Sequence, residues 1–539
     1  MDKGEKGRIA PPQSHRSSII YRPYTKVLFW FIILAMNTEI LSVEQMRQAE
    51  SLAMGGKAST YPLMQRAGRA VVDIVRERYE RQPVLVLCGA GNNGGDGFIA
   101  ACELKRKKWD VTVACIHEVK HLDGNVALAA HEWGEDVIPF DKLDLPTEGL
   151  IIDAIYGAGL EREITGDAQE ILFRLQRSMC PVIAVDVPTG LYSDTGDCQP
   201  CTPQAELTVT FFRKKMGHVL MPGRIACGEI IVTDIGIKDS VIEEVDGPLV
   251  RENDPSLGWG EDASTKAFWT HKYHHGHVVV LGGRVMTGAG ALASLSALRT
   301  GAGLVTIVAH TDVMNVYRLA SPSLMVEPLT EMARFKEHLK DDRRNVVLVG
   351  PGAGLDHPAA LKKVVFDATG YNPQKYCILD ADALSVFEDD NRNFYKTIGE
   401  HCILTPHEGE FERIFPDYHG SKVERARAAS IKTGAIIVLK GADTVIAAPD
   451  GRAVINSTGT GWLATAGTGD VLAGMIAGLV CRKVLKPFDA VCAAVWMHGK
   501  AAELAGPGMI SDDLSSEIPS VLSLLTILRE NDEEIEDSE

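Results

Sequence analysis

Two separate series of alternating strand-like and helix-like segments limit what this chain can fold into. In each series, short runs rich in Val and Ile alternate with longer stretches of helical periodicity. The first series runs from Pro83 to Ile237, and the second begins at His277. Alternation of this kind is typical of a parallel sheet that carries helices on both faces. The sequence therefore predicts two α/β domains in one chain.

The length of the chain agrees with two domains, because single hydrophobic cores stop growing near ~250–300 residues. The chain has 539 residues, and we expect a first domain over 36–237 and a second over 271–530. Between them, residues 238–270 lose periodicity and become acidic, with Gly, Pro and Trp, which favours a linker. The acidic residues 531–539 are expected to form a disordered tail.

The first 35 residues contain a strongly apolar run, Val27 to Met36, which follows Arg16, Arg22 and Lys26. The run is shorter than the ~20 residues that span a bilayer, and no small-residue cleavage site of a signal peptide follows it. We interpret residues 1–35 as an extension outside the native fold, with translation starting at Met36.

The charge of the chain argues against two classes of partner. Lys and Arg total 55 against 72 Asp and Glu, which gives a net charge of -17. Such a chain repels nucleic-acid phosphates and anionic lipid unless a basic patch is segregated locally. We therefore expect neither a nucleic-acid nor a membrane partner.

The eleven cysteines are scattered and odd in number, which favours reduced thiols in a cytoplasmic protein over a disulfide framework. Cys198 and Cys201 are the exception, because they lie close together in the segment DCQPC. A zinc site needs a second ligand pair nearby, and the sequence shows none. A plain loop is favoured, and metal or redox use remains the alternative.

A glycine-rich segment, Asn92 to Gly97 (NNGGDG), stands between a predicted strand at Val84 to Cys88 and a helix. Glycines let backbone N–H groups approach an anion, and the helix start adds partial positive charge. Open α/β sheets bind ligands at this edge. A pyrophosphate would suit the loop, although a tight turn with a helix cap would look the same.

Three more strands, starting near Ile151, Val182 and Glu206, end in similar loops with Asp, Thr and Gly. Strand ends of this kind converge on one pocket. In their order and spacing, the four segments over Ile40 to Ile237 resemble the NAD(P)H-hydrate epimerase family. The resemblance implies a Rossmann-like three-layer sandwich.

The same resemblance implies a site for a hydrated dinucleotide. Asp186 would lie against the damaged nicotinamide ring as the catalytic acid/base group. A potassium ion would be held by Asn93, Asp153 and Thr189, whose hard oxygen atoms suit an alkali cation beside phosphate. The other implied substrate contacts are Asn92, Gly94, Gly95, Asp96, Gly157, Ala158, Gly159, Leu160, Glu161, Arg162 and Glu163, in addition to Asn93 and Asp186.

Lys214 and Lys215 match a lysine pair that usually follows Pro in this family, whereas Arg213 precedes them here. A solvated basic turn and a substrate contact are equal alternatives for the pair.

A second glycine-rich segment, Ala466 to Asp470 (AGTGD), opens a helix. Its backbone amides would form an anion hole, with Asp470 beside it. In ribokinase-like kinases a loop of this type stabilises the transferring phosphoryl group, while its Asp takes the proton of the attacking hydroxyl. A capping Asp is the alternative, but the small residues around Asp470 favour catalysis.

Other segments refine this likeness: KYHHGHVVVLGG with TGAGA, VGPGAG at Val349, LTPHEGEFERIF at Leu404 and LKGADTVIAAPDG at Leu439. Over His271 to Leu528 they resemble the ADP/ATP-dependent NAD(P)H-hydrate dehydratases, which implies a ribokinase-like α/β domain. The implied hydrate contacts are Ala289, Gly354, His407 and Asp470. The implied nucleotide contacts are Lys440, Gly441, Ala442, Asp443, Thr444 and Gly469.

Some positions allow a second interpretation. His407 could merely cap the helix that starts at Glu408. Arg284 stands where the family usually has Ser, and Asn456 to Gly459 replaces an Asn-Pro-containing stretch, which puts local nucleotide contacts in doubt. The histidines before the second series lack a fixed ligand spacing, so a solvated loop is favoured over a metal site; they are His271, His274, His275 and His277.

Together the two resemblances imply repair of hydrated NADH and NADPH. The first domain would interconvert the R and S hydrates, and the second would dehydrate the S hydrate in an ADP-dependent reaction, because phosphorylation turns the hydroxyl into a leaving group. Implied cofactors are K⁺, Mg²⁺ and ADP as phosphoryl donor, with ATP possible. We expect a cytoplasmic homo-oligomer. The rivals are a small-molecule kinase fused to a nucleotide-binding module, and a non-catalytic binding or scaffold protein.

Overall fold

The computed structural model describes residues 38–536, without 57–59, 371 and 373. Residues 1–35 and the proposed start at Met36 lie outside the described residues. Among the described helices, none is long and apolar enough to cross a membrane.

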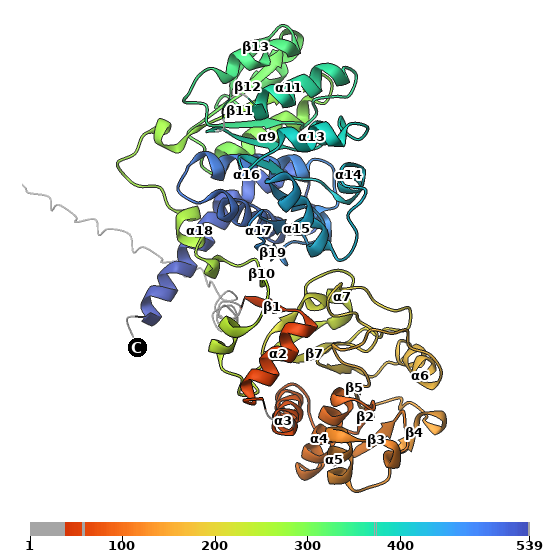
Figure 1. The fold of residues 1–539 in the computed structure, drawn as a ribbon. Coiled ribbons are helices and arrows are strands. Elements are labelled where there is room, and N and C mark those ends of the chain that lie inside the picture. Colours follow the sequence, from red (N-terminus) through yellow and green to blue (C-terminus); the bar gives the residue numbers. More distant parts are fainter. Residues whose placement is uncertain (1–37, 57–59, 371, 373, 537–539) are drawn as a thin grey trace, which may run out of the picture. The chain divides into compact units, whose positions relative to one another are not determined.

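The first series of segments forms a seven-stranded, entirely parallel sheet (Figure 1). In spatial order the strands are β4 (Ile138–Pro139), β3 (Val111–Cys115), β2 (Val84–Cys88), β5 (Leu150–Ala154), β6 (Val182–Val185), β7 (Leu207–Phe211) and β9 (Glu229–Thr233). Alternate residues of β2 serve two different cores: Val84 and Val86 pack in one, Leu85 and Leu87 in the other. Side chains alternate between the faces of a strand, so both faces of the sheet are covered.

Helices of the first domain divide between these two faces. One core is completed by α2 (Val43–Ala53), α3 (Tyr61–Arg78), α4 (Asn92–Arg106) and α5 (Gly124–Trp133). The other is completed by α6 (Asp167–Leu175), and a short helix α7 (Gly223–Cys227) precedes β9. The three-layer sandwich expected from the sequence is confirmed.

The second series of segments belongs to a twelve-stranded sheet. In spatial order its strands are β13 (Met325–Leu329), β12 (Leu304–His310), β11 (His277–Gly282), β14 (Val346–Val349), β15 (Tyr376–Leu379), β16 (Cys402–Leu404), β17 (Ile436–Leu439), β18 (Val445–Ala447), β19 (Ala453–Ile455), β10 (Val250–Glu252), β1 (Glu39–Leu41) and β8 (Lys214–Lys215). The strands from β13 to β17 are parallel, and β18 runs antiparallel to both of its neighbours.

Helices cover both faces of this sheet as well, so the α/β class is confirmed. One face carries α9 (Thr287–Arg299), α16 (Thr468–Cys481), α17 (Pro487–Ala505) and α18 (Ser511–Glu536). The other carries α11 (Pro358–Gly370), α12 (Asp382–Ser385), α13 (Asn391–Thr397), α14 (Glu408–Ile414) and α15 (Lys422–Thr433). A short helix, α10 (Met314–Ala320), lies between β12 and β13 in the chain.

The small-residue helices α9 and α16 pack closely, as their composition predicts. A Cβ at Gly474 of α16 would lie 2.0 Å from the carbonyl oxygen of Ala293 in α9. Only glycine fits there, because no real Cβ approaches a backbone atom so closely. This contact fixes the helix that carries Asp470.

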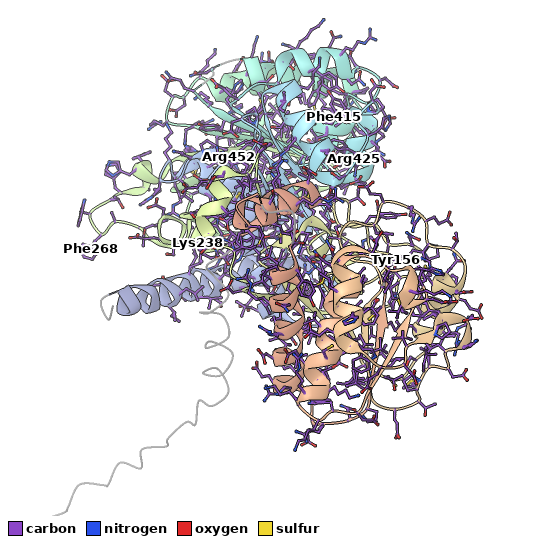
Figure 2. All side chains as sticks on the ribbon, turned by 60° about the horizontal axis from the view of Figure 1, so that its bottom comes forward. Tyr156, Lys238, Phe268, Phe415, Arg425 and Arg452 are labelled. Atoms are coloured by element: carbon purple, nitrogen blue, oxygen red, sulfur yellow. The ribbon has the colours of Figure 1, made fainter. Side chains whose placement is uncertain are left out.

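The segment expected to link the domains contains ordered structure. Its strand β10 pairs with β19 and β1, and Val241 belongs to the core of the first domain, whereas Trp259 belongs to the core of the second. A short helix, α8 (Gly260–Ser264), follows, and its last carbonyl groups accept hydrogen bonds from Arg482. The loop after α8 projects into solvent, where Phe268 is 98% exposed and points away from the domain (Figure 2).

Two expectations about the ends of the second domain need correction. Helix α18 continues to Glu536, so residues 531–536 are helical and not a disordered tail; glutamate is a good helix former, which explains the continuation. His277 is not part of a solvated loop, because it is buried in β11 with Nε2 2.8 Å from Thr306 Oγ1. The rings of His271 and His274 stack with centroids 3.8 Å apart.

All eleven cysteines are free thiols, and all except Cys198 are buried. Within the described part of the chain, no group of three or more His, Cys, Asp or Glu side chains could hold a metal ion. Cys198 and Cys201 lie in the loop between β6 and β7, where Cys198 forms an isolated bridge with Leu191.

Two candidate active sites

The first glycine-rich segment connects the end of β2 to the start of α4. A Cβ at Gly94 would lie 1.9 Å from the carbonyl oxygen of Gly89, so only glycine allows the helix to begin this close to the strand. The buried Asn93 follows the cap of the helix, Gly91. With its amide oriented so that oxygen faces a donor and nitrogen an acceptor, Asn93 donates from Nδ2 to the carbonyl of Val185 at 3.0 Å and accepts at Oδ1 from the Gly157 N–H at 3.3 Å. Three strand ends therefore meet at Asn93.

Asp153 and Thr189, the other predicted potassium ligands, lie in direct contact. The Thr189 hydroxyl donates to Asp153 Oδ1 at 2.7 Å, and the Thr189 N–H donates to Oδ2 at 2.8 Å. Asp153 is fully buried, and burial raises the pKa of its carboxyl, while hydrogen bonds from Thr189 and Ile155 lower it. No cationic side chain pairs with Asp153 among the described residues. The carboxylate is thus supported by hydrogen bonds alone.

The loop Gly157–Glu163 is held against the same strand ends. The Ala158 N–H donates to Asp186 Oδ2 at 3.0 Å. Farther along, Gln199 accepts from the Ile164 N–H at 2.8 Å and donates to the carbonyl of Arg162 at 2.9 Å. Leu160 is buried in the core behind the loop, whereas its three charged residues, Glu161, Arg162 and Glu163, are exposed.

Asp186 lies at the centre of this arrangement, with a backbone φ of 66°. Lys215 Nζ is 2.6 Å from Asp186 Oδ1, and the Thr210 hydroxyl lies 3.1 Å from the same oxygen. Burial raises the pKa of Asp186, but the charge and hydrogen bond of Lys215, together with the Ala158 amide, bring it below its ordinary value. The folded protein therefore keeps Asp186 ionised beside a buried ammonium group.

Lys215 is only 1% exposed, which excludes the solvated basic turn as its role. Lys214 is less buried and pairs with Glu252 at 2.7 Å. The two lysines of the sequence motif thus point to different partners, and Lys215 alone reaches the predicted acid/base group.

Two more carboxyl groups surround this ion pair. Burial raises the pKa of Glu50 in α2, which Lys215 lowers and Asp186 raises. Burial also raises the pKa of Asp96 well above its ordinary value, with further increases from Asp186 and Glu50. Glu50 could not be recognised from the sequence, because α2 precedes the first strand of the series and carries no motif.

In the second domain, Asp470 lies in the first turn of α16, beside the glycine-rich loop. Burial and the nearby charges of Asp380 and Asp382 raise the pKa of its carboxyl to about 6, although Lys440 acts in the opposite direction. A carboxyl that loses its proton near neutral pH suits a general base.

Lys440 pairs with a different carboxylate. Its Nζ lies 2.7 Å from Asp380 Oδ1, which also accepts from the Thr405 hydroxyl at 2.7 Å. Burial lowers the pKa of Lys440, but Asp380 and Glu410 raise it above its ordinary value. A Cβ at Gly469 would lie 3.4 Å from Lys440 Nζ, so this ammonium faces the loop that carries Asp470.

The structure therefore places Lys440 beside the proposed catalytic carboxylate as well as in the predicted nucleotide turn. Asp380 and Asp382, which the sequence analysis left without a role, belong to the same site. Asp382 Oδ2 accepts from the N–H of Gly354 at 2.8 Å, which ties the predicted hydrate loop to this cluster. The signal in the sequence was the pair of aspartates directly after β15.

Other predicted contacts surround this centre. Ala289 lies beside the same glycine loop, since a Cβ at Gly352 would be 3.2 Å from its Cβ. In the nucleotide turn, the Thr444 hydroxyl donates to the carbonyl of Gly441 at 2.8 Å, and Asp443 pairs with Lys422 at 2.5 Å. The second oxygen of Asp443 accepts from the Met221 N–H at 2.9 Å.

His407 does cap α14, as its alternative interpretation proposed. Its Nδ1 accepts from the Glu410 N–H at 3.2 Å, and the Glu410 carboxylate accepts from the His407 N–H at 2.8 Å. The side chain remains 56% exposed, and its backbone bridges to Lys440. Capping therefore leaves the imidazole within reach of a ligand.

The two departures from the family pattern have local explanations. Arg284 forms an exposed ion pair with Asp312 at 2.6 Å. Asn456 is buried and accepts from Asn253 Nδ2 at 3.0 Å, which fastens the segment after β10.

Comparisons with known proteins match both halves of the chain. A family model described as YjeF-related protein N-terminus matches residues 60–217, and one described as NAD(P)H-hydrate dehydratase matches residues 278–520. A solved structure of an ADP/ATP-dependent NAD(P)H-hydrate dehydratase from Bacillus subtilis, co-crystallised with ATP and Mg²⁺, is 29% identical and covers 49% of this chain and 97% of that chain, with a TM-score of 0.43.

Two curated relatives extend over both domains. The bifunctional NAD(P)H-hydrate repair enzyme Nnr of Escherichia coli (strain K12) is 32% identical over 483 residues, which cover 86% of this chain and 90% of that protein. The enzyme of the same name from Archaeoglobus fulgidus is 34% identical over 475 residues, which cover 85% and 93%. This chain belongs to the family of bifunctional NAD(P)H-hydrate repair enzymes.

Proposed function

We propose that this chain repairs hydrated NADH and NADPH with its two sites. The first domain interconverts the R and S hydrates, and the second dehydrates the S hydrate with ADP as phosphoryl donor. The observation that carries the proposal is the position of Asp470 at the start of α16, beside the amides of Gly467 to Gly469 and the ammonium of Lys440. This is the combination that phosphoryl transfer to a hydroxyl requires.

In the epimerase site, Asp186 is the acid/base group for the carbon that carries the hydroxyl. Inversion there requires one bond of that carbon to break and to re-form on the opposite face, while a proton is removed and returned. Asp186, ionised beside Lys215, can accept and return that proton. The loops Asn92–Asp96 and Gly157–Glu163 bind the dinucleotide. They meet beside Asp186, because Asn93 of the first loop contacts Gly157 of the second, and Ala158 donates to the Asp186 carboxylate.

The residues predicted to hold potassium fit such an ion chemically. Asp153 is a fully buried carboxylate without a cationic partner among the described residues, and Asn93 and Thr189 add amide and hydroxyl oxygens beside it. A monovalent cation bound there would balance the charge of Asp153 and of a nearby pyrophosphate.

In the dehydratase site, Asp470 accepts the proton of the ring hydroxyl as that oxygen attacks the β-phosphorus of ADP. The amides of the loop and Lys440 stabilise the charge on the transferring group, and AMP leaves. The C–O bond of the phosphorylated ring then breaks, phosphate leaves, and loss of a proton from the adjacent carbon restores the dihydropyridine. Residues 440–444 and Gly469 hold the nucleotide, while Ala289, Gly354 and His407 line the hydrate site.

Mg²⁺ and the choice of donor belong to the same proposal. Mg²⁺ would neutralise the charge of the nucleotide phosphates held by residues 440–444 and Gly469, and ATP is the alternative donor. The cytoplasmic location and homo-oligomeric state are proposed from the sequence.

The test uses the full chain with each separated hydrate epimer, with and without ADP. We expect the wild type to convert both epimers to NADH when ADP is present. Asp186→Asn should consume only the S epimer. Asp470→Asn should equilibrate the epimers but lose about 10²–10⁴-fold in dehydration, the range for a general base. Asp512 also lies in the first turn of a helix, α18, and serves as the matched control. Asp512→Asn should leave both activities unchanged.

The fused-kinase alternative predicts a stable phosphorylated product and no reduced nicotinamide. The scaffold alternative predicts binding without turnover and no effect of Asp470→Asn. Either outcome would overturn the proposal.

A further inference from the structure

We propose that His218 is a positioning residue of the epimerase site, where its neutral imidazole holds the backbones of Asp186 and Lys215 so that their ion pair stays aligned. The proposal rests on the proposed acid/base role of Asp186. His218 lies in the segment that starts near Glu206, where the sequence assigned it no role, and its side chain is 1% exposed.

The imidazole bridges the two residues of the ion pair through their main chains. Its Nδ1 accepts from the N–H of Lys215 at 2.9 Å. Its Nε2 lies 2.9 Å from the carbonyl oxygen of Asp186. One ring therefore ties together two residues that lie far apart in the chain.

The partners fix the tautomer of this ring. A backbone N–H can only donate, so Nδ1 must present a lone pair to Lys215. A carbonyl oxygen can only accept, so Nε2 must carry the proton that faces Asp186. Protonation of Nδ1 would set two donors against each other and break the bridge. Because both ring nitrogens are engaged, His218 cannot itself exchange a proton with substrate, which is why we assign it to positioning.

Its surroundings keep the ring neutral. Burial and the charges of Lys215 and Lys214 together lower the pKa of His218 to about 4, although Asp186 acts in the opposite direction. The imidazole thus remains uncharged across the neutral range and leaves the single positive charge on Lys215 to face the carboxylate.

Asp186 needs this support because of its backbone. A φ of 66° is uncommon and strained for a residue with a side chain, so the surrounding structure must hold it. Its N–H donates to the carbonyl of Val209 at 2.8 Å, and its carbonyl is held by His218. Loss of the second contact frees the peptide to rotate and to move the carboxylate away from Lys215.

Three substitutions separate the two contacts. His218→Phe keeps the ring volume and removes both hydrogen bonds. His218→Gln places an amide donor near the position of Nε2 and can retain the bond to Asp186. His218→Asn places an amide oxygen near the position of Nδ1 and can retain the bond to Lys215.

We expect His218→Phe to lower the kcat of epimerisation by roughly 10²-fold, the effect of misplacing a catalytic group by about 1 Å, with a much smaller change in KM. His218→Gln should recover most of the loss, and His218→Asn should recover less. In His218→Phe, the acid limb of the pH profile of kcat should move to higher pH. Asp186 loses its alignment with Lys215, whose charge otherwise lowers the pKa of this carboxyl. Dehydration of the S hydrate by the same chains should remain at the wild-type rate and report correct folding.

Two results would overturn the proposal: a kcat for His218→Phe equal to that of the wild type, or an equal loss in the Phe and Gln variants without movement of the acid limb. Asp186→Asn separates this failure from failure of the proposed function. If the wild type interconverts epimers and Asp186→Asn does not, the proposed function holds whatever His218 does. If the wild type itself does not interconvert them, the proposed function fails first.

Discussion

The two sites contain the same kinds of groups but place their lysine on different carboxylates. In the first domain, Lys215 pairs directly with Asp186, the predicted acid/base group, at 2.6 Å. In the second, Lys440 pairs with Asp380 at 2.7 Å, and Asp470 has no ion pair among the described residues. The pKa of Asp186 accordingly lies below its ordinary value, whereas that of Asp470 rises to about 6.

This difference shows how the position of one lysine sets the task of a buried aspartate. Burial raises the pKa in both sites, and a contacting ammonium reverses the effect only where it meets the carboxylate itself. Asp186 therefore remains an anion across the neutral range. Asp470 gains and loses its proton near neutral pH, as a group that must accept a proton from a hydroxyl should.

Removing the lysine of the first site should have the largest effect on stability. Lys215→Met leaves the Asp186 carboxylate buried without a counter-charge, which costs about 3–5 kcal/mol of unfolding free energy near neutral pH. The double variant Lys215→Met, Asp186→Asn should recover most of this loss, because no charge remains. Denaturant unfolding of the three chains measures both values.

The pH dependence of this effect has a definite sign. A carboxyl whose pKa is lowered by folding contributes stability above its unfolded pKa and loses it as the pH falls through the folded pKa. The difference between wild type and Lys215→Met should therefore shrink in acid. Lys214→Met is the matched control: its pair with Glu252 keeps more contact with water, so a loss as large as that of Lys215→Met would contradict the comparison.

At the second site, Asp470→Asn should stabilise the protein although it removes activity. The pKa of Asp470 rises from 3.8 to about 6 on folding, so the folded state binds more protons between these values, and stability falls as the pH rises through this window. At neutral pH, Asp470→Asn should raise the unfolding free energy by at most about 3 kcal/mol. The partial exposure of this side chain to water makes the expected gain smaller. Thermal unfolding should give Asp470→Asn a higher Tm than the wild type at pH 7, and the two chains should have the same Tm near pH 4. A lower Tm for the variant at pH 7 would contradict the assignment.

Asp380→Asn should make the second site resemble the first. Without Asp380, Lys440 is free to pair with Asp470, whose pKa then falls. Wild-type dehydration should rise with pH through about 6, because the base must lose its proton. In the variant this limb should lie at lower pH. When the rate at pH 5 is divided by the rate of the same chain at neutral pH, this ratio should be higher in the variant than in the wild type, by at most about tenfold. A limb that stays in place would show that Asp380 does not influence Asp470.

The sequence predicts the framework of both sites because it depends on local patterns. Alternating segments define parallel sheets, and the carboxyl ends of parallel strands meet at one edge, so loops such as Gly157–Glu163 and the residues Asn93 and Asp186 had to converge. Strand β10 escaped prediction because its three residues, Val250–Glu252, are too few to show a period.

The pairing of charges could not be predicted. Lys440 stands in a motif for nucleotide binding, and nothing in that motif indicates that its ammonium meets Asp380 at the end of β15, a strand separated from β17 by β16. The partner of Lys215 depends on the positive φ of Asp186, and Glu50 approaches from a helix without a motif. These features follow from tertiary packing, which no short segment records.

The smallest predicted effect concerns potassium, which we expect to distinguish the first site. Binding to the native state alone stabilises by RT ln(1 + [K⁺]/Kd), or about 0.8 kcal/mol at three times the Kd. Thr189→Val removes the hydroxyl that contacts Asp153, so the rise in Tm on replacing Na⁺ by K⁺ should disappear. Thr208→Val, which removes an equally buried hydroxyl bonded to the Cys227 carbonyl, should retain it. If both variants keep the response, potassium binds elsewhere, and Asp153 is then a hydrogen-bonded core carboxylate with no cation to balance.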